Sequence, residues 1–277
     1  MSKLKEIFEH KALEVAAAKS TVSLEDIKRC AADRPAIRPF KKALEESGRP
    51  LALIAEVKKA SPSKGVIRED FDAAEVARAY RDAGAQCLSV LTDYKYFHGS
   101  RENLERAREE SGLPCLRKDF VCDPYQVYEA RAWGADAILL IVAAFMPSSF
   151  AIPWSSATQA GHPIACLNSL WTLAKDLGMD VLVEIHSREE VDVALRMGAD
   201  LIGVNNRNLA DMSTSLSMSE ELLPLFSSHA FAVSESALGT PADLARVQAA
   251  GARGVLIGTT FCASPDIGGK VREVMGW

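Results

Sequence analysis

The stretch Met197-Gly198-Ala199-Asp200-Leu201-Ile202-Gly203-Val204-Asn205 contains the end of a helix, a turn and a buried strand in immediate succession. Glycine just past a helix end adopts the left-handed conformation that turns the chain back toward a sheet. The apolar run after it, Leu201–Val204, lacks strict alternation of polar and apolar residues, as expected for a parallel strand buried on both faces. The stretch therefore predicts one helix–strand unit of an α/β protein.

The same unit of helix, glycine turn and apolar run recurs along the chain. It appears again around Gly84, Gly134 and Gly251, each followed by a β-rich run. Runs of this kind predict eight strands, near residues 51–57, 87–91, 113–117, 136–142, 180–184, 200–204, 229–234 and 253–258. Eight strands at intervals of mostly about 21–35 residues are typical of an α/β fold of the (β/α)8 TIM-barrel class.

A doubly wound open sheet is the main structural alternative. That fold normally places a glycine-rich turn directly after its first strand. This chain has Lys58-Lys59-Ala60-Ser61-Pro62-Ser63 at the corresponding place, which favours the barrel.

We expect residues 1–277 to form a single (β/α)8 barrel domain. Residues 1–50 precede the first strand, and their apolar residues follow a helical pattern, which predicts an N-terminal helical extension that caps one end of the barrel. The long interval between the fourth and fifth strands contains a stretch rich in Pro, Ser and aromatic residues, 147–163. We interpret this stretch as a surface insertion and not as a second domain.

The composition is that of a soluble protein with a full-sized core, because 48% of its residues are hydrophobic and 25% are charged. A net charge of −5 gives no reason to propose nucleic acid or a membrane as a partner. The longest apolar run, 137–146, is too short to cross a bilayer. The six cysteines show no zinc-ligand spacing and no signal segment precedes them, so the sequence predicts reduced thiols, no metal and a cytoplasmic location.

Seven of the eight strand-like runs end in a polar or charged residue. The carboxyl ends of barrel strands are where (β/α)8 enzymes keep their active sites. Glu56 and Lys58 lie two apart on one strand and share a face, while Lys118 ends the third strand and Glu184 ends the fifth. Glu56 and Lys58 alone could form a structural ion pair, and the other two could be rim charges. Four ionisable groups at three strand ends favour a catalytic set.

Two turns suit a phosphate group, Ser234-Glu235-Ser236 after the seventh strand and Gly258-Thr259-Thr260 after the eighth. These are the loops in which (β/α)8 barrels frequently bind phosphate, through hydroxyls and free backbone N–H groups. Ordinary N-capping of the next helices explains either turn alone, but both together favour phosphate. His98 and His186 fall in no metal-ligand pattern, and we interpret both as loop histidines.

Several longer motifs carry a resemblance to a known family. The most specific are Ile54-Ala55-Glu56-Val57-Lys58-Lys59-Ala60-Ser61-Pro62-Ser63-Lys64-Gly65 and Leu116-Arg117-Lys118-Asp119-Phe120. They are joined by 88–93, 123–126, 183–186 and 203–209, in order over nearly the whole chain. On these motifs the sequence resembles indole-3-glycerol phosphate synthase, a family of tryptophan biosynthesis.

The resemblance implies one (β/α)8 barrel with an N-terminal extension and no cofactor. It implies a phosphorylated small-molecule substrate, 1-(2-carboxyphenylamino)-1-deoxyribulose 5-phosphate, which is converted to indole-3-glycerol phosphate, carbon dioxide and water. As partners we expect no macromolecule beyond other tryptophan-pathway enzymes, so the chain is expected to be a monomer or to associate with those enzymes.

The resemblance also implies roles for individual residues. Lys118 looks like the general acid that assists ring closure, because a ketone needs an acid near its oxygen before the ring attacks it. Glu184 and Glu56 look like the carboxylates that handle protons around decarboxylation and dehydration. Lys58 looks like a binder of the substrate carboxylate, and an acid role in dehydration stays open for it.

The remaining implied residues bind the two ends of the substrate. Those expected to line the anthranilate pocket are Phe120, Leu139, Asn205 and Leu256. Those expected to surround the phosphate are Ser61, Arg207, Ser236, Gly258 and Thr259. The sequence departs from the family at Ala237, where a glycine usually follows Ser-Glu-Ser and lets the backbone approach the phosphate closely.

Two other functions remain as alternatives at this point. A related phosphate-binding barrel of the phosphoribosylanthranilate isomerase type would need a cysteine/aspartate acid–base pair, and no cysteine here ends a predicted strand. A divergent barrel that binds phosphorylated ligands without turnover is the non-enzymatic alternative, suggested by Ala237 and the 147–163 stretch.

Overall fold

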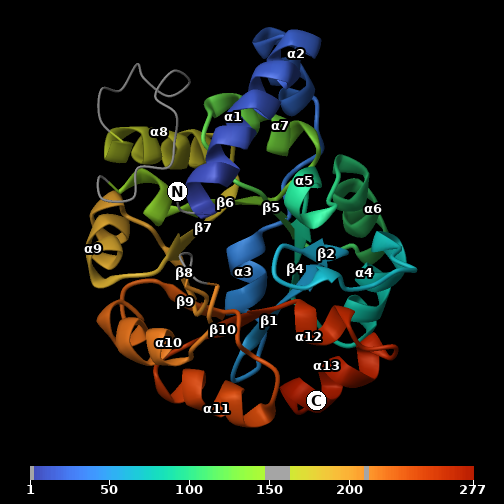
Figure 1. Cartoon of the computed structure of the whole chain (residues 1–277), viewed down its shortest axis with the longest axis vertical. Helices are drawn as coiled ribbons and strands as arrows, with labels where there is room; N and C mark the ends of the chain where they lie inside the picture. The colour runs from blue at the N-terminus through green and yellow to red at the C-terminus, as the bar shows by residue number, and fades with distance from the viewer. Residues whose placement is uncertain (1–2, 147–162, 209–211) are drawn as a thin grey trace.

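Eight parallel strands close into a barrel in the computed structural model, with helices around the outside (Figure 1). The structure describes residues 3–146, 163–208 and 212–277. The barrel strands in spatial order are β1 (Ala52–Val57), β10 (Gly254–Ile257), β9 (Phe231–Glu235), β8 (Leu201–Asn205), β7 (Asp180–Ile185), β6 (Ala137–Ile141), β5 (Cys115–Lys118) and β4 (Cys87–Leu91). The predicted (β/α)8 barrel and its eight strands are confirmed.

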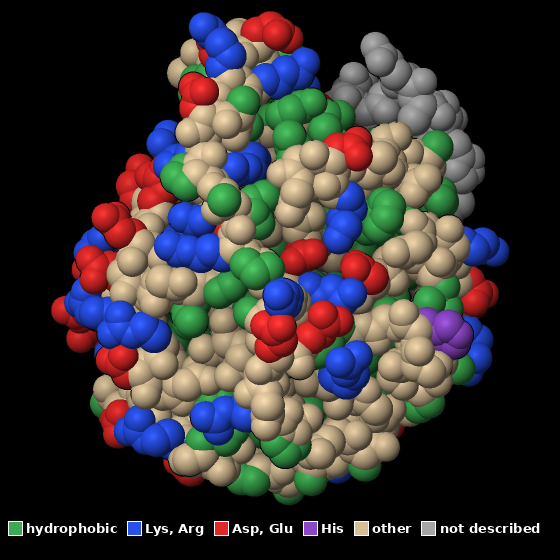
Figure 2. All heavy atoms as spheres, turned by 180° about the vertical axis from the view of Figure 1, so that it is seen from behind, with side chains coloured by type: hydrophobic (Ala, Val, Ile, Leu, Met, Phe, Trp, Pro, Cys, Tyr) green, Lys and Arg blue, Asp and Glu red, His purple; other side chains and the backbone are tan. Residues whose placement is uncertain are grey.

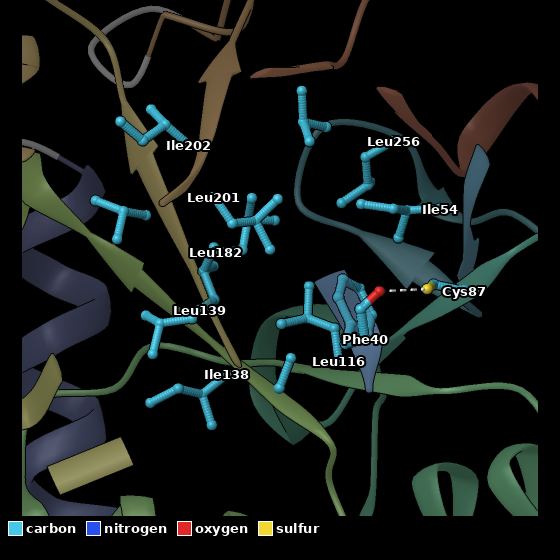
Figure 3. Close-up of a cluster of buried hydrophobic side chains, with 14 of the residues drawn as sticks. Phe40, Ile54, Cys87, Leu116, Ile138, Leu139, Leu182, Leu201, Ile202 and Leu256 are labelled. Carbon is cyan, nitrogen blue, oxygen red and sulfur yellow. Dashed lines mark hydrogen bonds between the residues drawn. The ribbon is translucent and has the colours of Figure 1, made fainter. Parts of the chain in front are cut away.

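The strands are buried because each carries apolar side chains on both faces. Every residue of β1, β4, β6, β9 and β10 is buried. Figure 3 shows apolar side chains of several strands meeting in the interior, among them Ile54, Leu116, Leu139, Leu182 and Leu256. Burial of such side chains contributes about 1.5–3 kcal/mol each to folding.

The outer helices follow the strands in sequence. They are α4 (Ala73–Asp82), α6 (Arg101–Ser111), α7 (Pro124–Ala132), α8 (Pro163–Asp176), α9 (Arg188–Met197), α10 (Ser217–Leu222), α11 (Pro241–Ala249) and α13 (Ile267–Met275). Shorter elements lie between them: β2 (Ala60–Ser61), β3 (Gly65–Val66), α5 (Tyr94–Phe97), η1 (Val142–Phe145), η2 (Leu223–Leu225) and α12 (Thr259–Cys262). Gly198 ends α9 with a φ of 84°, the left-handed cap expected from the sequence.

Three N-terminal helices contact the two ends of the barrel. They are α1 (Lys3–Thr21), α2 (Leu24–Ala32) and α3 (Phe40–Glu45). Phe40 is fully buried, and its carbonyl accepts a hydrogen bond from Cys87 at the start of β4 (Figure 3). The backbone N–H of Lys41 donates to Asp180 at the start of β7. Helix α3 therefore closes the amino-terminal end.

Helix α1 is attached near the opposite end by a buried cation. The side chain of Lys11 is 5% exposed, and its Nζ lies 2.8 Å from Asp93 and 2.9 Å from Asp119, which follow β4 and β5. Farther along α1, Lys19 pairs with Asp123 at 2.7 Å. Figure 1 shows α1 and α2 together beside α7. Helix α1 is the capping helix that the sequence predicted. The sequence analysis did not predict that a separate helix, α3, closes the other end of the barrel.

Other expectations concern regions away from the barrel mouth. The 147–163 stretch lies outside the described residues except for Pro163, where α8 begins. All six cysteines are free thiols. Within the described ranges, no helix combines the length and apolar character that a membrane span requires. Figure 2, the face opposite to that of Figure 1, shows acidic and basic side chains interspersed.

Candidate active site

The carboxyl ends of the barrel strands surround a cavity of about 460 Å³. Its wall includes every residue that the sequence analysis assigned to catalysis or substrate binding: Glu56, Lys58, Ser61, Lys118, Phe120, Leu139, Glu184, Asn205, Arg207, Ser236, Leu256, Gly258 and Thr259. The strand-end pattern thus places these side chains at one mouth. Helix α1 adds Lys3, Leu4 and Ile7 to the wall, which the sequence analysis did not assign.

Lys118 lies between two carboxylates at the centre of the cavity. Its Nζ is 2.9 Å from Oε2 of Glu184 and 2.8 Å from Oε2 of Glu235. Burial alone would lower the pKa of Lys118, but the charges of Glu184, Glu235 and Glu56 outweigh it and raise the pKa above the usual value. Lys118 is therefore an ammonium at neutral pH, aimed into the cavity with its donors held by acceptors from two strands.

The two carboxylates beside Lys118 have different affinities for a proton. Burial raises the pKa of Glu235 to about 7, and the neighbouring charge of Glu184 adds to the effect. Burial acts on Glu184 in the same direction, but the charges of Lys118 and His186 and a hydrogen bond with Asn205 lower its pKa. Two carboxyl groups whose environments separate their pKa values are the usual arrangement for one acid and one base in the same site.

The sequence analysis missed Glu235. It interpreted Ser234-Glu235-Ser236 as a phosphate turn, whereas β9 continues to Glu235 and directs this side chain into the mouth. A signal was present on the adjacent strand, at Gly203 of β8. A Cβ at Gly203 would overlap Oε1 of Glu235, and glycine inside a strand often marks such a close approach.

Glu56 and Lys58 form the second charged pair. Lys58 Nζ donates to Oε1 of Glu56, and the Glu56 side chain is 7% exposed. Gly258 of the neighbouring loop leaves room for this carboxylate, because a Cβ at Gly258 would lie 2.9 Å from the Cβ of Glu56 and would overlap its Oε1. Gly258 lines the cavity, and its lack of a side chain leaves the space that the Glu56 carboxylate fills.

The opposite part of the wall has the features of an anion site. Ser236 and Ala237 both adopt left-handed backbone conformations, with φ values of 66° and 59°. Asn206 fixes this turn, since its Nδ2 donates to Ser234 Oγ at 2.9 Å and to Ser236 O at 3.2 Å. Ser61 lines the cavity, and its buried hydroxyl has no hydrogen-bond partner among the described residues.

A third part of the wall is apolar. Leu139 of β6 and Leu256, together with Phe120 after β5, present hydrophobic surface to the cavity. Phe8 of α1 packs edge to face on Phe120, with ring centroids 5.7 Å apart. The apolar wall therefore depends on the docking of α1, and a flat aromatic ligand would match it.

A buried ion network supports the strand end that carries Lys118. Asp119 accepts hydrogen bonds from Thr92 at 2.7 Å and Arg117 at 3.0 Å, besides its contact with Lys11. Burial would raise the pKa of Asp119, but the charges of Lys11 and Arg117 lower it below the usual range. The sequence analysis did not identify this network, because its members come from distant parts of the chain.

The two histidines interpreted as loop residues differ from each other. His98 is exposed and ends α5 in a left-handed conformation, so the interpretation is confirmed there. His186 follows β7, but its side chain is only 11% exposed and its Nε2 lies 3.4 Å from Oε1 of Glu184. His186 is a loop histidine as interpreted, and its contact with Glu184 was not foreseen.

A (β/α)8 barrel with a lysine and several carboxylates around a cavity at the strand carboxyl ends defines the class of barrel enzymes that act on small molecules. Residues 4–274 match the family described as Indole-3-glycerol phosphate synthase. The chain belongs to the indole-3-glycerol phosphate synthase family.

Individual relatives support this assignment. The chain is 45% identical over 274 residues to "Indole-3-glycerol phosphate synthase" of Bordetella pertussis, and 98% of each chain is covered. It is 46% identical over 274 residues to the protein of the same name from Neisseria gonorrhoeae, again with 98% of each covered. A Dehalococcoides mccartyi protein of that name is 45% identical over 240 residues, 86% of each chain.

Solved structures of low identity share the fold. A mandelate oxidase mutant superposes with a TM-score of 0.58 at 20% identity, covering 91% of this chain and 92% of that one. Thiamine phosphate pyrophosphorylase from Pyrococcus furiosus gives 0.55 at 15% identity, with 82% and 95% covered. At such identities the similarity establishes the barrel alone.

Proposed function

We propose that this chain converts 1-(2-carboxyphenylamino)-1-deoxyribulose 5-phosphate to indole-3-glycerol phosphate, carbon dioxide and water. This is the carboxy-lyase reaction of indole-3-glycerol phosphate synthase in tryptophan biosynthesis. Family membership over residues 4–274 supports the reaction. The observation that carries the proposal is the position of Lys118, whose Nζ lies within 2.9 Å of both Glu184 and Glu235 at the centre of the cavity.

The wall of the cavity orients the substrate. The phosphate binds at the turn of Ser236 with Ser61, Arg207, Gly258 and Thr259 around it, since left-handed turns and helix starts present N–H groups to anions. The aromatic ring lies against Leu139, Phe120 and Leu256. With both ends placed, the ribulose chain passes over Lys118.

Ring closure requires an acid at the ketone oxygen. The ring carbon that bears the carboxylate attacks the ketone carbon, and the carbonyl π electrons move to oxygen. Lys118 donates a proton to that oxygen, so the former ketone oxygen becomes a neutral hydroxyl group on the newly closed ring. Glu235, whose pKa is raised to about 7, is partly protonated at neutral pH and lies 2.8 Å from Lys118, which lets it return a proton to the amine.

The later steps need a base and a second acid. Loss of carbon dioxide returns the electron pair of the broken bond to the ring. Departure of the hydroxyl as water needs a proton donor, for which Lys58 beside Glu56 is placed. The indole then forms when the carbon next to nitrogen gives up a proton, which the ionised Glu184 accepts. Lys58 also binds the substrate carboxylate before it is lost.

An isomerase of the phosphoribosylanthranilate type is not supported by the cavity. That activity needs a cysteine as part of its acid–base pair. Among the described residues that line the cavity, none is a cysteine.

The reaction is tested by incubating the purified chain with the carboxyphenylamino substrate and following the fluorescence of the indole product. Lys118→Ala protein, shown to be folded by circular dichroism, is the matched control. Product formation by the wild type and its loss in the variant is the expected result. Substrate binding without product, in both proteins, would support a non-catalytic ligand binder instead.

The proposal includes the setting of the reaction. We propose that residues 1–277 act as one domain in the cytoplasm, as a monomer or in association with other tryptophan-pathway enzymes. Light scattering of the purified chain, alone and mixed with those enzymes, distinguishes the two states.

A further inference from the structure

His186 lies between two carboxylates on opposite sides of its ring. Its Nε2 is 3.4 Å from Oε1 of Glu184 and its Nδ1 is 3.6 Å from Oε2 of Glu190. Both ring nitrogens are buried, and neither has a hydrogen-bond partner among the described residues. A neutral imidazole has one N–H group, whereas an imidazolium has two, one for each carboxylate. The arrangement therefore favours the charged ring.

The start of α9 holds Glu190 in this position. Ser187 caps the helix and accepts a hydrogen bond from the backbone N–H of Glu190 at 3.3 Å. The Glu190 carboxylate in turn accepts from the backbone N–H of His186 at 2.9 Å. Because the capping bonds fix both the backbone and the carboxylate, the ring of His186 has a fixed acidic neighbour on the side away from the cavity.

The other charged groups around the ring come from three strands. Glu184 belongs to β7, Glu235 to β9 and Lys118 to β5, while η1 packs on β7 and α9 and contains only apolar residues. Burial alone would lower the pKa of His186. The contact with Glu190 and the charges of Glu184 and Glu235 outweigh burial and raise it.

The two carboxylates that share Lys118 differ in their second neighbour. Glu184 has Lys118 at Oε2 and His186 at Oε1, so a cation faces each of its oxygens. Glu235 has Lys118 at Oε2, but its Oε1 lies against Gly203 and has no hydrogen-bond partner in the described part of the chain. Of the two groups, Glu184 is the one whose negative charge is compensated from both sides.

We propose that His186 is a positioning residue that keeps Glu184 ionised, so that the proton shared by the two carboxylates of Lys118 stays on Glu235. This inference rests on the proposed roles of Lys118 and Glu184. The acid and the base of the site are then assigned by a residue that touches neither substrate nor Lys118. Without the imidazolium, the proton distributes over both carboxylates and part of the base is lost.

The test compares the pH dependence of kcat/KM in wild type, His186→Asn and His186→Gln. An opposite charge within this distance lowers a carboxyl pKa by roughly one unit or more. We therefore expect the acid limb of both variants to move up by roughly one unit, which makes them about tenfold slower than wild type on that limb. At high pH the wild-type ring also loses its proton, so the difference should vanish there, with KM little changed.

His229→Asn is the matched control, because His229 is an exposed histidine that lies outside the cavity wall. Its profile should coincide with that of wild type. A wild-type profile in the folded His186 variants, or an equal loss at every pH, would overturn the proposal, since an equal loss indicates a purely structural role.

Titration of the imidazole signals by NMR provides a readout that does not depend on turnover. The signal that disappears in His186→Asn should titrate above the ordinary pH range of a histidine, and Glu190→Gln should move it down. A His186 signal that titrates below the ordinary range of a histidine would contradict the proposal even in a fully active enzyme. An inactive wild type with the expected titration would instead contradict the proposed reaction.

Discussion

The side chain of Glu235 on β9 fills the space beside Gly203 on the adjacent strand β8, where a side chain at position 203 would otherwise lie. A Cβ at Gly203 would overlap Oε1 of Glu235 and would lie 3.2 Å from Cδ1 of Leu182. The β8–β9 register pairs Asn205 with Glu235, which brings the two strands together at the mouth. The glycine thus sets the direction in which Glu235 reaches Lys118.

Gly203→Ala should therefore displace Glu235 from Lys118. A misplacement of about 1 Å at a reacting group costs roughly 10²-fold in rate, and we expect a loss of kcat of that order. The control is Gly268→Ala in α13, where the added Cβ meets nothing closer than 3.4 Å. Steady-state kinetics of both variants provide the test, and an unchanged kcat in Gly203→Ala would show that Glu235 does not need this position.

Lys118→Ala should lower kcat by roughly 10²–10⁴-fold, the usual contribution of a positioned acid. Lys118→Arg should restore little activity, because a guanidinium keeps its proton and has a planar shape. Circular dichroism should show a folded protein in both cases, since the side chain lies at a polar mouth. Near-normal turnover of folded Lys118→Ala would shift the acid role to Lys58.

Lys58→Ala should affect binding more than chemistry. Lys58 follows β1 and pairs with Glu56, and among the described residues it forms no ion pair with Glu184 or Glu235. The main interaction lost in the variant is therefore the one with the substrate carboxylate. We expect a KM increase that exceeds the fall in kcat, measured side by side with Lys118→Ala. A larger effect on kcat than on KM would show that the role of Lys58 as acid in dehydration outweighs its role in substrate binding.

Ala237→Gly should stabilise the protein and tighten phosphate binding. Ala237 has a φ of 59°, in the left-handed region that costs a residue with a Cβ about 1 kcal/mol or more. Glycine removes this cost, so we expect a higher melting temperature and a lower KM with kcat unchanged. Ala250→Gly is the control, because Ala250 has a φ of −78° and should gain nothing. A large change in kcat at constant KM would contradict this role.

Glu235→Gln should change how stability depends on pH. The pKa of Glu235 is raised in the folded state, from 4.5 to about 7. Its stabilising contribution is therefore complete below the unfolded pKa and is lost as pH rises through about 7, by a few kcal/mol at most. Glutamine does not titrate, so the variant should gain stability over wild type between pH 5 and pH 8 in thermal unfolding. If the difference in melting temperature between variant and wild type did not change from pH 5 to pH 8, Glu235 would be ionised over this whole range.

The barrel was predictable because its evidence is local. Most strands are short apolar runs preceded by a glycine turn, and seven of the eight runs end in a polar or charged residue. Glu56, Lys58, Lys118 and Glu184 could be placed at the mouth for the same reason. The segment Ser234-Glu235-Ser236 was interpreted only as a phosphate turn, because its residue types suit an anion site. Gly203 on the neighbouring strand is the feature that indicates the direction of Glu235 toward Lys118.

The remaining contacts depend on tertiary structure. His186 approaches Glu184 because a capping interaction at Ser187 fixes Glu190 behind the ring. Lys11 is buried because two loops after separate strands provide carboxylates for it. Closure of the barrel brings the partners of Lys11 together from distant segments. Glu184, His186 and Glu190 are close in sequence, but their spacing alone does not give the direction of the imidazole ring.

The attachment of α1 has a consequence for synthesis of the protein on the ribosome. Helix α1 is made early, yet its partner for Lys19 is Asp123, 104 positions further along. The carboxylates that neutralise Lys11 also appear only after β4 and β5 have been made. A nascent chain therefore carries an unpaired amphipathic helix until three of the eight barrel strands have emerged, and in this interval it offers apolar surface to chaperones.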